Sequence, residues 1–185
     1  MTLLNLLNHE LSWHKRSDWD EAIELLKTFS SEHTDEPSHV KDLARIVRFR
    51  IDGIDAFIQQ NTAVVCPNCE KVCCINKHGY YDYEDLIYIH ALGLKPPIYK
   101  EGISDTDPCQ FLSEFGCTIE RAVRPFRCNW YFCDALLEHI EQGPAKPYRM
   151  FIKQLDEIVD LRKEMLDEFF RILKENSLYT LSSLE

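Results

Sequence analysis

The chain has 185 residues, which is enough for one domain with its own hydrophobic core. Charged side chains make up 28% of it and apolar side chains 45%, values typical of a globular protein in water. With 21 basic and 31 acidic residues the net charge is −10. This charge argues against unaided binding to nucleic acid or to an anionic membrane, because both need basic surface.

The N-terminal residues MTLLNLLNHELSWHKR do not resemble a secretory signal, since they lack a basic first region and polar residues interrupt their apolar positions. No stretch approaches the roughly 20 apolar residues that a transmembrane helix requires. We therefore expect a cytoplasmic protein, whose cysteines stay reduced instead of forming disulfides.

Residues 1–60 are predicted to be helical. Leucines at steps of three and four predict a first helix near residues 3–11, and Ser17 with Asp20 resembles a capping box that starts a second. A third helix is expected after Pro37, with Gly53 as a weak point inside it. Its predicted apolar stripe consists of Val40, Leu43, Val47, Ile51, Ile54 and Ile58.

Residues 61–133 break this pattern, because they contain five of the eight prolines and four of the six glycines. One helix is predicted there, over residues 82–92, and Gly93 ends it. The rest is expected to be loop. A loop region of this length needs something other than secondary structure to organise it, and metal coordination would do so.

Residues 134–142 are predicted to form a short helix closed by Gly143, and residues 148–176 the longest helix. Its apolar stripe is predicted to pack on the N-terminal helices and consists of Phe151, Leu155, Ile158, Leu161, Met165, Phe169 and Leu173. The prediction is thus one domain over residues 1–185, mainly α, with little or no sheet. Helical parts over 1–60 and 134–185 would flank a loop-rich, metal-organised cysteine core over 61–133.

All eight cysteines lie between Cys66 and Cys133. The first group, CPNCEKVCC, contains Cys66, Cys69, Cys73 and Cys74. Two cysteines separated by two residues form a metal-binding knuckle, in which a turn directs both sulfurs at one ion. No βαβ pattern accompanies this pair, which argues against a thioredoxin-like redox site. Adjacent cysteines point to opposite sides of an extended chain, so Cys73 and Cys74 need not both reach the same ion, and which of them is a ligand stays open.

The second group consists of Cys109, Cys117, Cys128 and Cys133, without another pair spaced by two residues. Thiolates from separated loops are more typical of an iron–sulfur site or an irregular zinc site than of a zinc ribbon. Either centre takes four ligands, so eight cysteines allow two sites, or one site and spare thiols. Three arginines among these cysteines either offset the thiolate charge or are ordinary surface residues: Arg121, Arg124 and Arg127.

Other residues near the cysteines have alternative interpretations. His78 could complete a site of three cysteines and one histidine, whereas the remaining histidines are predicted to lie at the surface or at the edge of the core. Trp130 and Phe132 are expected to cover the site. Four tyrosines either shield a cluster from water or simply pack: Tyr80, Tyr81, Tyr83 and Tyr88.

Taken in order, these motifs resemble the YkgJ-type cysteine-cluster family, which is described as zinc- or iron-chelating. The matching pieces are the cluster Cys66-Cys69-Cys73-Cys74, Asp85 in a short helix, Cys109-Gln110-Phe111-Leu112, Gly116-Cys117-Thr118-Ile119, and Arg124-Pro125 with Cys128. The first cluster has three residues, 70–72, where the family has two, and the segment between Cys117 and Arg124 is one residue longer. Cys133 is an additional cysteine beyond the family pattern.

The resemblance implies metal or iron–sulfur binding and leaves the reaction open. The first hypothesis is a cytoplasmic protein that holds an iron–sulfur cluster, which is slightly favoured, or zinc, with electron transfer or redox sensing as its role. In the second, structural zinc supports a module whose acidic helices bind a protein partner. In the third, the centre is an accessory of a methyl-transferring or oxidoreductase-type enzyme, by analogy with the related motif in flagellin lysine methylases.

Overall fold

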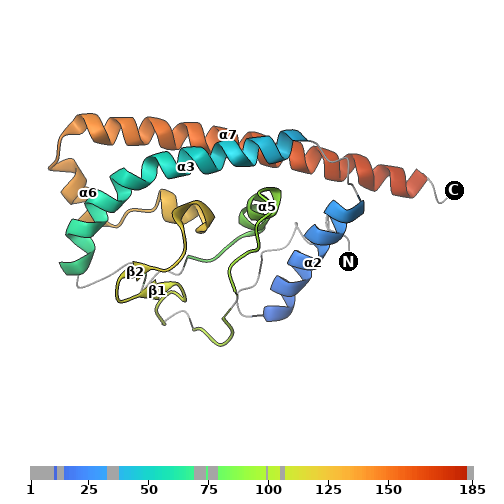
Figure 1. The fold of residues 1–185 in the computed structure, drawn as a ribbon, viewed down its shortest axis with the longest axis horizontal. Coiled ribbons are helices and arrows are strands. Elements are labelled where there is room, and N and C mark those ends of the chain that lie inside the picture. The colour runs from blue at the N-terminus through green and yellow to red at the C-terminus, as the bar shows by residue number, and fades with distance from the viewer. Residues whose placement is uncertain are drawn as a thin grey trace.

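The computed structural model describes residue 11 and residues 15–32, 38–68, 74, 79–98, 100–104 and 107–182, with residues 30–32, 38 and 176–182 described by their backbone only. Two long antiparallel helices, α3 (Ser38–Val65) and α7 (Ala145–Ser182), lie side by side along the whole molecule (Figure 1). The prediction of a mainly α-helical fold is confirmed.

The predicted apolar stripe of α3 forms one side of the core. All six of its members are buried, and they recur at the steps of three and four that place them on one helix face. The helix runs through Gly53 without a break, and Gly53 as an energetic weak point stays a prediction. It also continues five residues past the predicted end, to Val65, and Thr62 Oγ1 donates a 2.8 Å hydrogen bond to the Ile58 carbonyl in this last part.

Helix α7 begins at Ala145, earlier than predicted, because a proline in the first turn sacrifices no intrahelical hydrogen bond. Its predicted stripe faces α3 and the core. The Phe151 ring stacks on Phe57 of α3, with 4.7 Å between the ring centroids, and on Phe132, with 5.3 Å. Arg50 of α3 and Glu157 of α7 form an ion pair at 3.6 Å. These contacts join α3 and α7, which are far apart in the sequence, into one layer.

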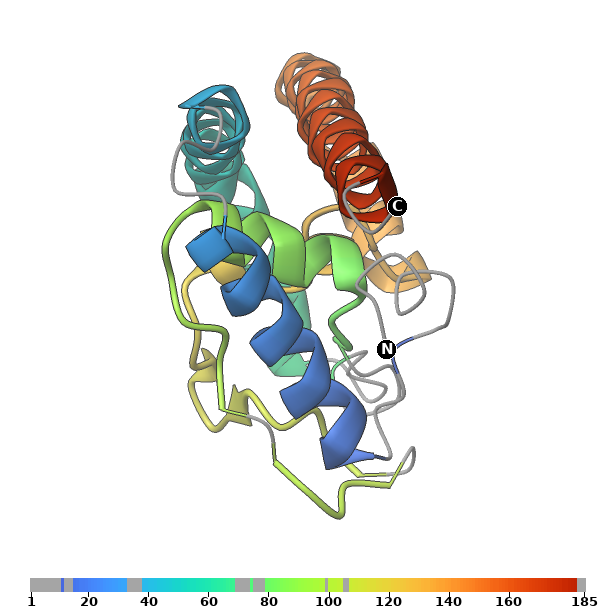
Figure 2. The ribbon, with the colours of Figure 1, turned by 90° about the vertical axis from the view of Figure 1, so that its right-hand side faces the viewer.

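Beneath this layer lie α5 (Tyr83–Ala91), which contacts both long helices, and α2 (Arg16–Glu32), which packs on α5 (Figure 2). The Ser17–Asp20 capping box is wrong, since α2 already includes both residues. A capping box occurs instead at α5, where Asp82 accepts from the Asp85 backbone N–H and the Asp85 carboxylate accepts from the Asp82 N–H. The first predicted helix lies outside the described residues except for Leu11, which is buried.

The predicted loop region is held by short elements: the 3₁₀ turns η1 (Cys66–Asn68), η2 (Arg121–Val123) and η3 (Phe126–Asn129), and the strands β1 (Leu112–Ser113) and β2 (Gly116–Cys117). The strands form an antiparallel hairpin in which Leu112 pairs with Cys117 and Ser113 with Gly116. Helix α6 (Asp134–Glu141) then leads into α7. Within the described ranges no helix combines the length and apolarity that a membrane span demands.

Candidate metal centre

The described cysteines belong to six different places in the chain. Cys66 follows α3 directly, and Cys133 precedes α6. Cys117 ends the hairpin, and Cys128 lies in η3. The other two described cysteines are Cys74 and Cys109. Cys117 is exposed, and the other five are half-buried. Cys69, Cys73 and His78 lie outside the described residues.

Backbone hydrogen bonds bring the two cysteine groups together. The Cys109 N–H donates to the Cys74 carbonyl at 2.7 Å, although 35 residues separate them in sequence (109 − 74 = 35). The Cys109 carbonyl accepts from the Leu112 N–H at 2.8 Å, and Leu112 pairs with Cys117 across the hairpin. The hairpin turn requires Gly116, whose φ of 102° few other residues adopt. One continuous set of main-chain contacts therefore connects Cys74, Cys109 and Cys117.

Cys128 approaches Gly79 closely. A Cβ atom at position 79 would lie 2.9 Å from the Cys128 Sγ and 3.4 Å from Pro125 Cγ. Glycine is therefore the residue that leaves room for this sulfur. Neither the spacing of the cysteines nor the composition of the segment indicated this role, because the contact joins residues far apart in the sequence.

Three of the thiols lie near enough to interact electrostatically. The pKa of the Cys128 thiol is raised to about 12, chiefly by burial and then by the charges of Cys117 and Cys109, against a lowering by Arg124. Thiolates that disfavour one another's ionisation need a positive charge among them, and a bound metal ion supplies such a charge and deprotonates its thiol ligands. The donor set therefore fits a thiophilic metal ion or a cluster.

The arrangement is not a complete coordination sphere. In the part of the chain that the structure describes, no group of three or more His, Cys, Asp or Glu side chains is placed so that it could hold a metal ion. Cys109, Cys117 and Cys128 share one neighbourhood. The predicted eight-cysteine ligand set thus remains a prediction.

Asp85, the acidic residue of the family pattern, is buried with 3% of its surface exposed. Its Oδ1 accepts hydrogen bonds from the Phe126 N–H at 3.0 Å and from Arg162 Nη2 at 2.9 Å. Arg162 also donates to Glu84 at 2.6 Å and lies over the Phe126 ring, 4.7 Å from its centroid. Because Phe126 begins η3, the carboxylate contacts the turn that carries Cys128.

The charges of this network are set by opposing effects. The pKa of Asp85 is raised to about 6, because burial and the charge of Asp82 outweigh the lowering by Arg162 and the Phe126 N–H. Burial alone would lower the pKa of Arg162, but Asp85 and Glu84 outweigh it and the net shift is upward. Both side chains are therefore charged at neutral pH.

The three arginines of this region have three different environments. Arg121 is buried, with its Nε bonded to the Asp55 carboxylate of α3 and its Nη1 donating to the Cys128 carbonyl at 3.3 Å. Arg124 is half-buried and donates from Nε to the Ile119 carbonyl at 3.0 Å. Arg127 is exposed. The charges of Arg124 and Arg121 thus both act on Cys128, and the surface alternative fits Arg127.

The aromatic residues are distributed differently from the prediction. Tyr81 is buried and lies near Cys109, Cys117 and Cys128, and its hydroxyl donates to the Val123 carbonyl at 2.6 Å. Trp130, in contrast, is 47% exposed. The Phe132 ring stacks on Phe151 in the helical core. The expectation that Trp130 and Phe132 cover the site is therefore wrong, and Tyr81 is the aromatic residue that borders the three thiols.

Asn129 is a polar residue of the site that the sequence analysis missed. Its side chain is completely buried, and among the described residues neither its amide nitrogen nor its oxygen has a hydrogen-bond partner. Buried amides rarely stay unpaired. This amide follows Cys128 directly, so it is available to bond to a thiolate or to water. An asparagine between two cysteines carries no sequence signal of burial.

Replacing Gly79 with alanine is expected to displace the Cys128 sulfur and to lower the free energy of unfolding of the metal-free protein by about 1–3 kcal/mol, as overpacking does. The matched control is Gly53→Ala in α3, where an added Cβ meets nothing within 4 Å. That change should stabilise the protein by about 0.5–1 kcal/mol, because alanine favours helix. Urea unfolding of both variants measures the two effects, and equal stabilities would contradict the close approach.

Comparisons of the chain with models of known families, with curated proteins and with solved structures found no match.

Proposed function

We propose that this chain is a metal-binding protein whose cysteines hold an iron–sulfur cluster or a zinc ion. The observation that carries the proposal is the convergence of Cys109, Cys117 and Cys128 from three separate segments onto one neighbourhood. Cys74 joins them through its backbone bond to Cys109. Four such thiols would supply the ligand number that zinc or a [4Fe–4S] cluster requires.

An iron–sulfur centre would transfer electrons or sense the redox state of the cell. Its surroundings would set its potential, because hydrogen bonds, burial and nearby charge tune such clusters. Arg124 would offset part of the thiolate charge, and the buried Tyr81 would limit access of water from its side. A zinc ion at the same place would have no redox role and would add folding free energy to the loop-rich segment.

An enzyme with an accessory centre is the weaker alternative. A surface hollow lies on α7 beside the N-terminal end of α3, and its lining contains no cysteine: His39, Asp160, Lys163, Glu164, Asp167, Glu168 and Arg171. Because it does not adjoin the thiols, this hollow gives no support to a substrate site that uses the metal.

Metal analysis of protein purified without oxygen tests the proposal. Brown protein that contains iron and sulfide and absorbs near ~400 nm would establish the iron–sulfur form. Colourless protein with stoichiometric zinc and no iron would establish the zinc form. Protein that contains neither metal, and takes up neither when it is refolded with Fe²⁺ and sulfide or with Zn²⁺, would overturn the proposal.

Replacing Cys109 or Cys128 with serine is expected to lower the metal content to less than half and to reduce the melting temperature of the metal-loaded protein. The same result is expected for Cys66→Ser if both cysteine groups bind metal. Ser17→Ala, on the exposed side of α2, is the control and should change neither quantity. Unchanged metal content in the Cys109 and Cys128 variants would show that these thiols are not ligands.

A further inference from the structure

Cys128 differs from the hairpin cysteine in how its backbone is held. Cys117 is exposed on a two-residue strand. The turn that carries Cys128 is instead contacted on both sides by ion pairs. Asp85 and Arg162, both buried, meet it at the N–H of Phe126, and the buried Arg121, paired with the half-exposed Asp55, meets it at the carbonyl of Cys128 itself.

These ion pairs come from the helices, not from the cysteine loops. Asp55 lies on α3, Asp85 on α5 and Arg162 on α7, and Arg121 bridges from η2. Every long helix of the layer, and α5 beneath it, thus contributes one charged group to the η3 turn. The turn is also closed from within, because the Cys128 N–H donates to the Pro125 carbonyl at 2.8 Å.

Stability alone is a poor explanation for this arrangement. Burying an ion pair costs about as much in desolvation as its attraction returns, and apolar residues of similar volume often serve stability as well. The two pairs instead fix the position of the η3 turn, because each directs one hydrogen bond to a main-chain atom of that turn. A metal site needs this property, because its ligands must be held close to the productive geometry.

We propose that Asp85 with Arg162, and Asp55 with Arg121, are positioning residues that fix Cys128 in its binding geometry before any metal arrives. This inference rests on the proposed function, in which Cys128 is a ligand. It goes further because it states that the helical scaffold, and not the metal, holds Cys128 in a fixed position. The residues act through the backbone of η3 and do not touch the metal themselves.

The test measures the reactivity of each cysteine in reduced, metal-free protein with N-ethylmaleimide, by mass spectrometry of the digested protein over time. Thiol labelling depends on access and ionisation, so it reports on local order at each site. In Asp85→Ala, which removes the acceptor for the Phe126 N–H, Cys128 should react at least tenfold faster than in the unmodified chain. Cys117 is already exposed and should keep its rate.

Two further variants separate positioning from general loss of stability. Asp85→Asn retains an oxygen where Oδ1 accepts from Phe126, so the Cys128 rate should return to within about threefold of normal. Asp82→Ala removes the other half of the α5 capping box and an exposed carboxylate 3.7 Å from Arg162, but it keeps the bonds of Asp85 to Phe126 and Arg162. It should leave the Cys128 rate unchanged while weakening the helix. Arg121→Met, which removes the donor to the Cys128 carbonyl, should behave like Asp85→Ala.

Equal Cys128 rates in Asp85→Ala and Asp82→Ala, with circular dichroism showing both folded, would overturn the inference. So would faster labelling of all cysteines together, which indicates general unfolding. A titration with Co²⁺ alone then tests the proposed function separately: Asp85→Ala should bind Co²⁺ at least tenfold more weakly than Asp82→Ala. If the Cys128 rate rises but Co²⁺ affinity does not fall, the turn is positioned as inferred, and Cys128 as a ligand is contradicted.

Discussion

Replacing Arg162 with alanine is expected to lower the free energy of unfolding by about 3–5 kcal/mol, because it leaves a buried carboxylate without its cationic partner. Arg162 is 5% exposed and Asp85 3%, so water cannot take the place of the guanidinium. Glu84 and Asp82, the other carboxylates that pair with Arg162, are at least half exposed and keep their hydration. The loss therefore arises at Asp85, and urea unfolding at pH 7 measures it.

The free energy of unfolding of Arg162→Ala should depend strongly on pH, and the charges at Asp85 determine the direction. Burial holds the folded-state pKa of Asp85 above its ordinary value of 3.8, and losing Arg162 raises that pKa further. At a pH between the unfolded-state and folded-state pKa values of Asp85, the folded protein binds a proton that the unfolded chain has released. The free energy of unfolding therefore falls as the pH rises through this interval. We expect Arg162→Ala to be markedly more stable at pH 5 than at pH 8.

Two control variants test whether the unpaired charge of Asp85 causes this loss of stability. Arg171→Ala removes a half-exposed guanidinium from the same helix, where it pairs with Glu168 and Glu175 at the surface, and it should change stability little. The double variant Arg162→Met with Asp85→Ala removes both charges and should recover part of the loss. If the double variant is as unstable as Arg162→Ala, the cost comes from lost packing and not from an unpaired charge.

Replacing Phe151 with alanine is expected to cost about 3–5 kcal/mol of unfolding free energy, the range for a large aromatic residue in a core. Its ring is 2% exposed and stacks between Phe57 of α3 and Phe132, which precedes Cys133. The cavity would remove the ring contacts that α7 makes here with Phe57 and Phe132.

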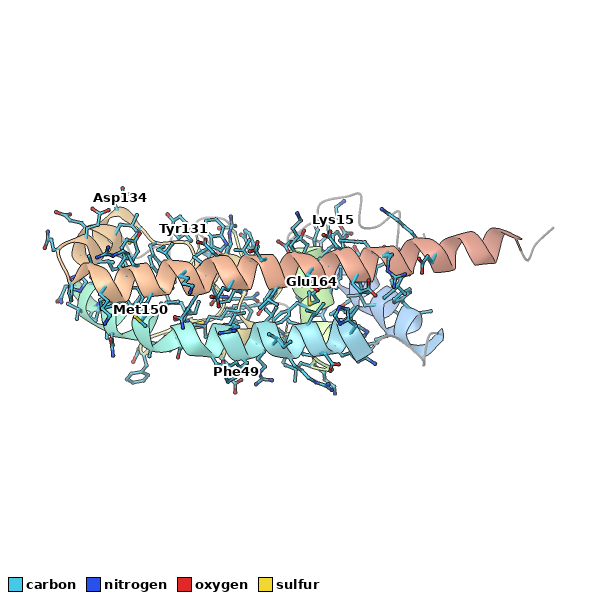
Figure 3. The ribbon with its side chains drawn as sticks, turned by 90° about the horizontal axis from the view of Figure 1, so that it is seen from above. Lys15, Phe49, Tyr131, Asp134, Met150 and Glu164 are labelled. Carbon is cyan, nitrogen blue, oxygen red and sulfur yellow. The ribbon has the colours of Figure 1, made fainter. Side chains whose placement is uncertain are left out.

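Phe49→Ala is the matched control for this change. Phe49 is 73% exposed and lies on the side of α3 away from α7 (Figure 3), so its removal should alter stability by no more than about 0.5 kcal/mol. Denaturant unfolding of both variants gives the comparison. A small loss in Phe151→Ala would contradict the packing of α7 on α3 at this point.

The long helices could be predicted from sequence because their signal is periodic and local. The stripe that includes Ile54 in α3 is buried as expected, and so is the stripe that includes Ile158 in α7 apart from the half-buried Leu155 and Leu161, since steps of three and four admit one burial face. Helix ends were less predictable. Val65 remains helical although its segment is rich in β-branched residues, which have lower helix propensity.

The candidate site was only partly predictable, for a physical reason. Cysteine spacing identifies thiols that suit a metal, but it does not say which loops meet in space. The partners of Arg121 and Arg162 lie 66 and 77 residues away in sequence, so no local pattern reveals those ion pairs. Asp85 could be singled out through the family resemblance, whereas its bond to the Phe126 N–H required the fold.

The pairing of α3 with α7 also has an entropic consequence for the residues between them. The 79 residues from 66 to 144 form a closed loop, because the aromatic contacts of Phe57 with Tyr148 and Phe151 hold its two ends together. Closing a flexible loop of that length costs roughly 4 kcal/mol. Apolar packing of the helices offsets this free-energy cost. The effective concentration of each thiol around the others is therefore already high in the metal-free chain. A bound metal would then have to order only the short segments that carry its ligands.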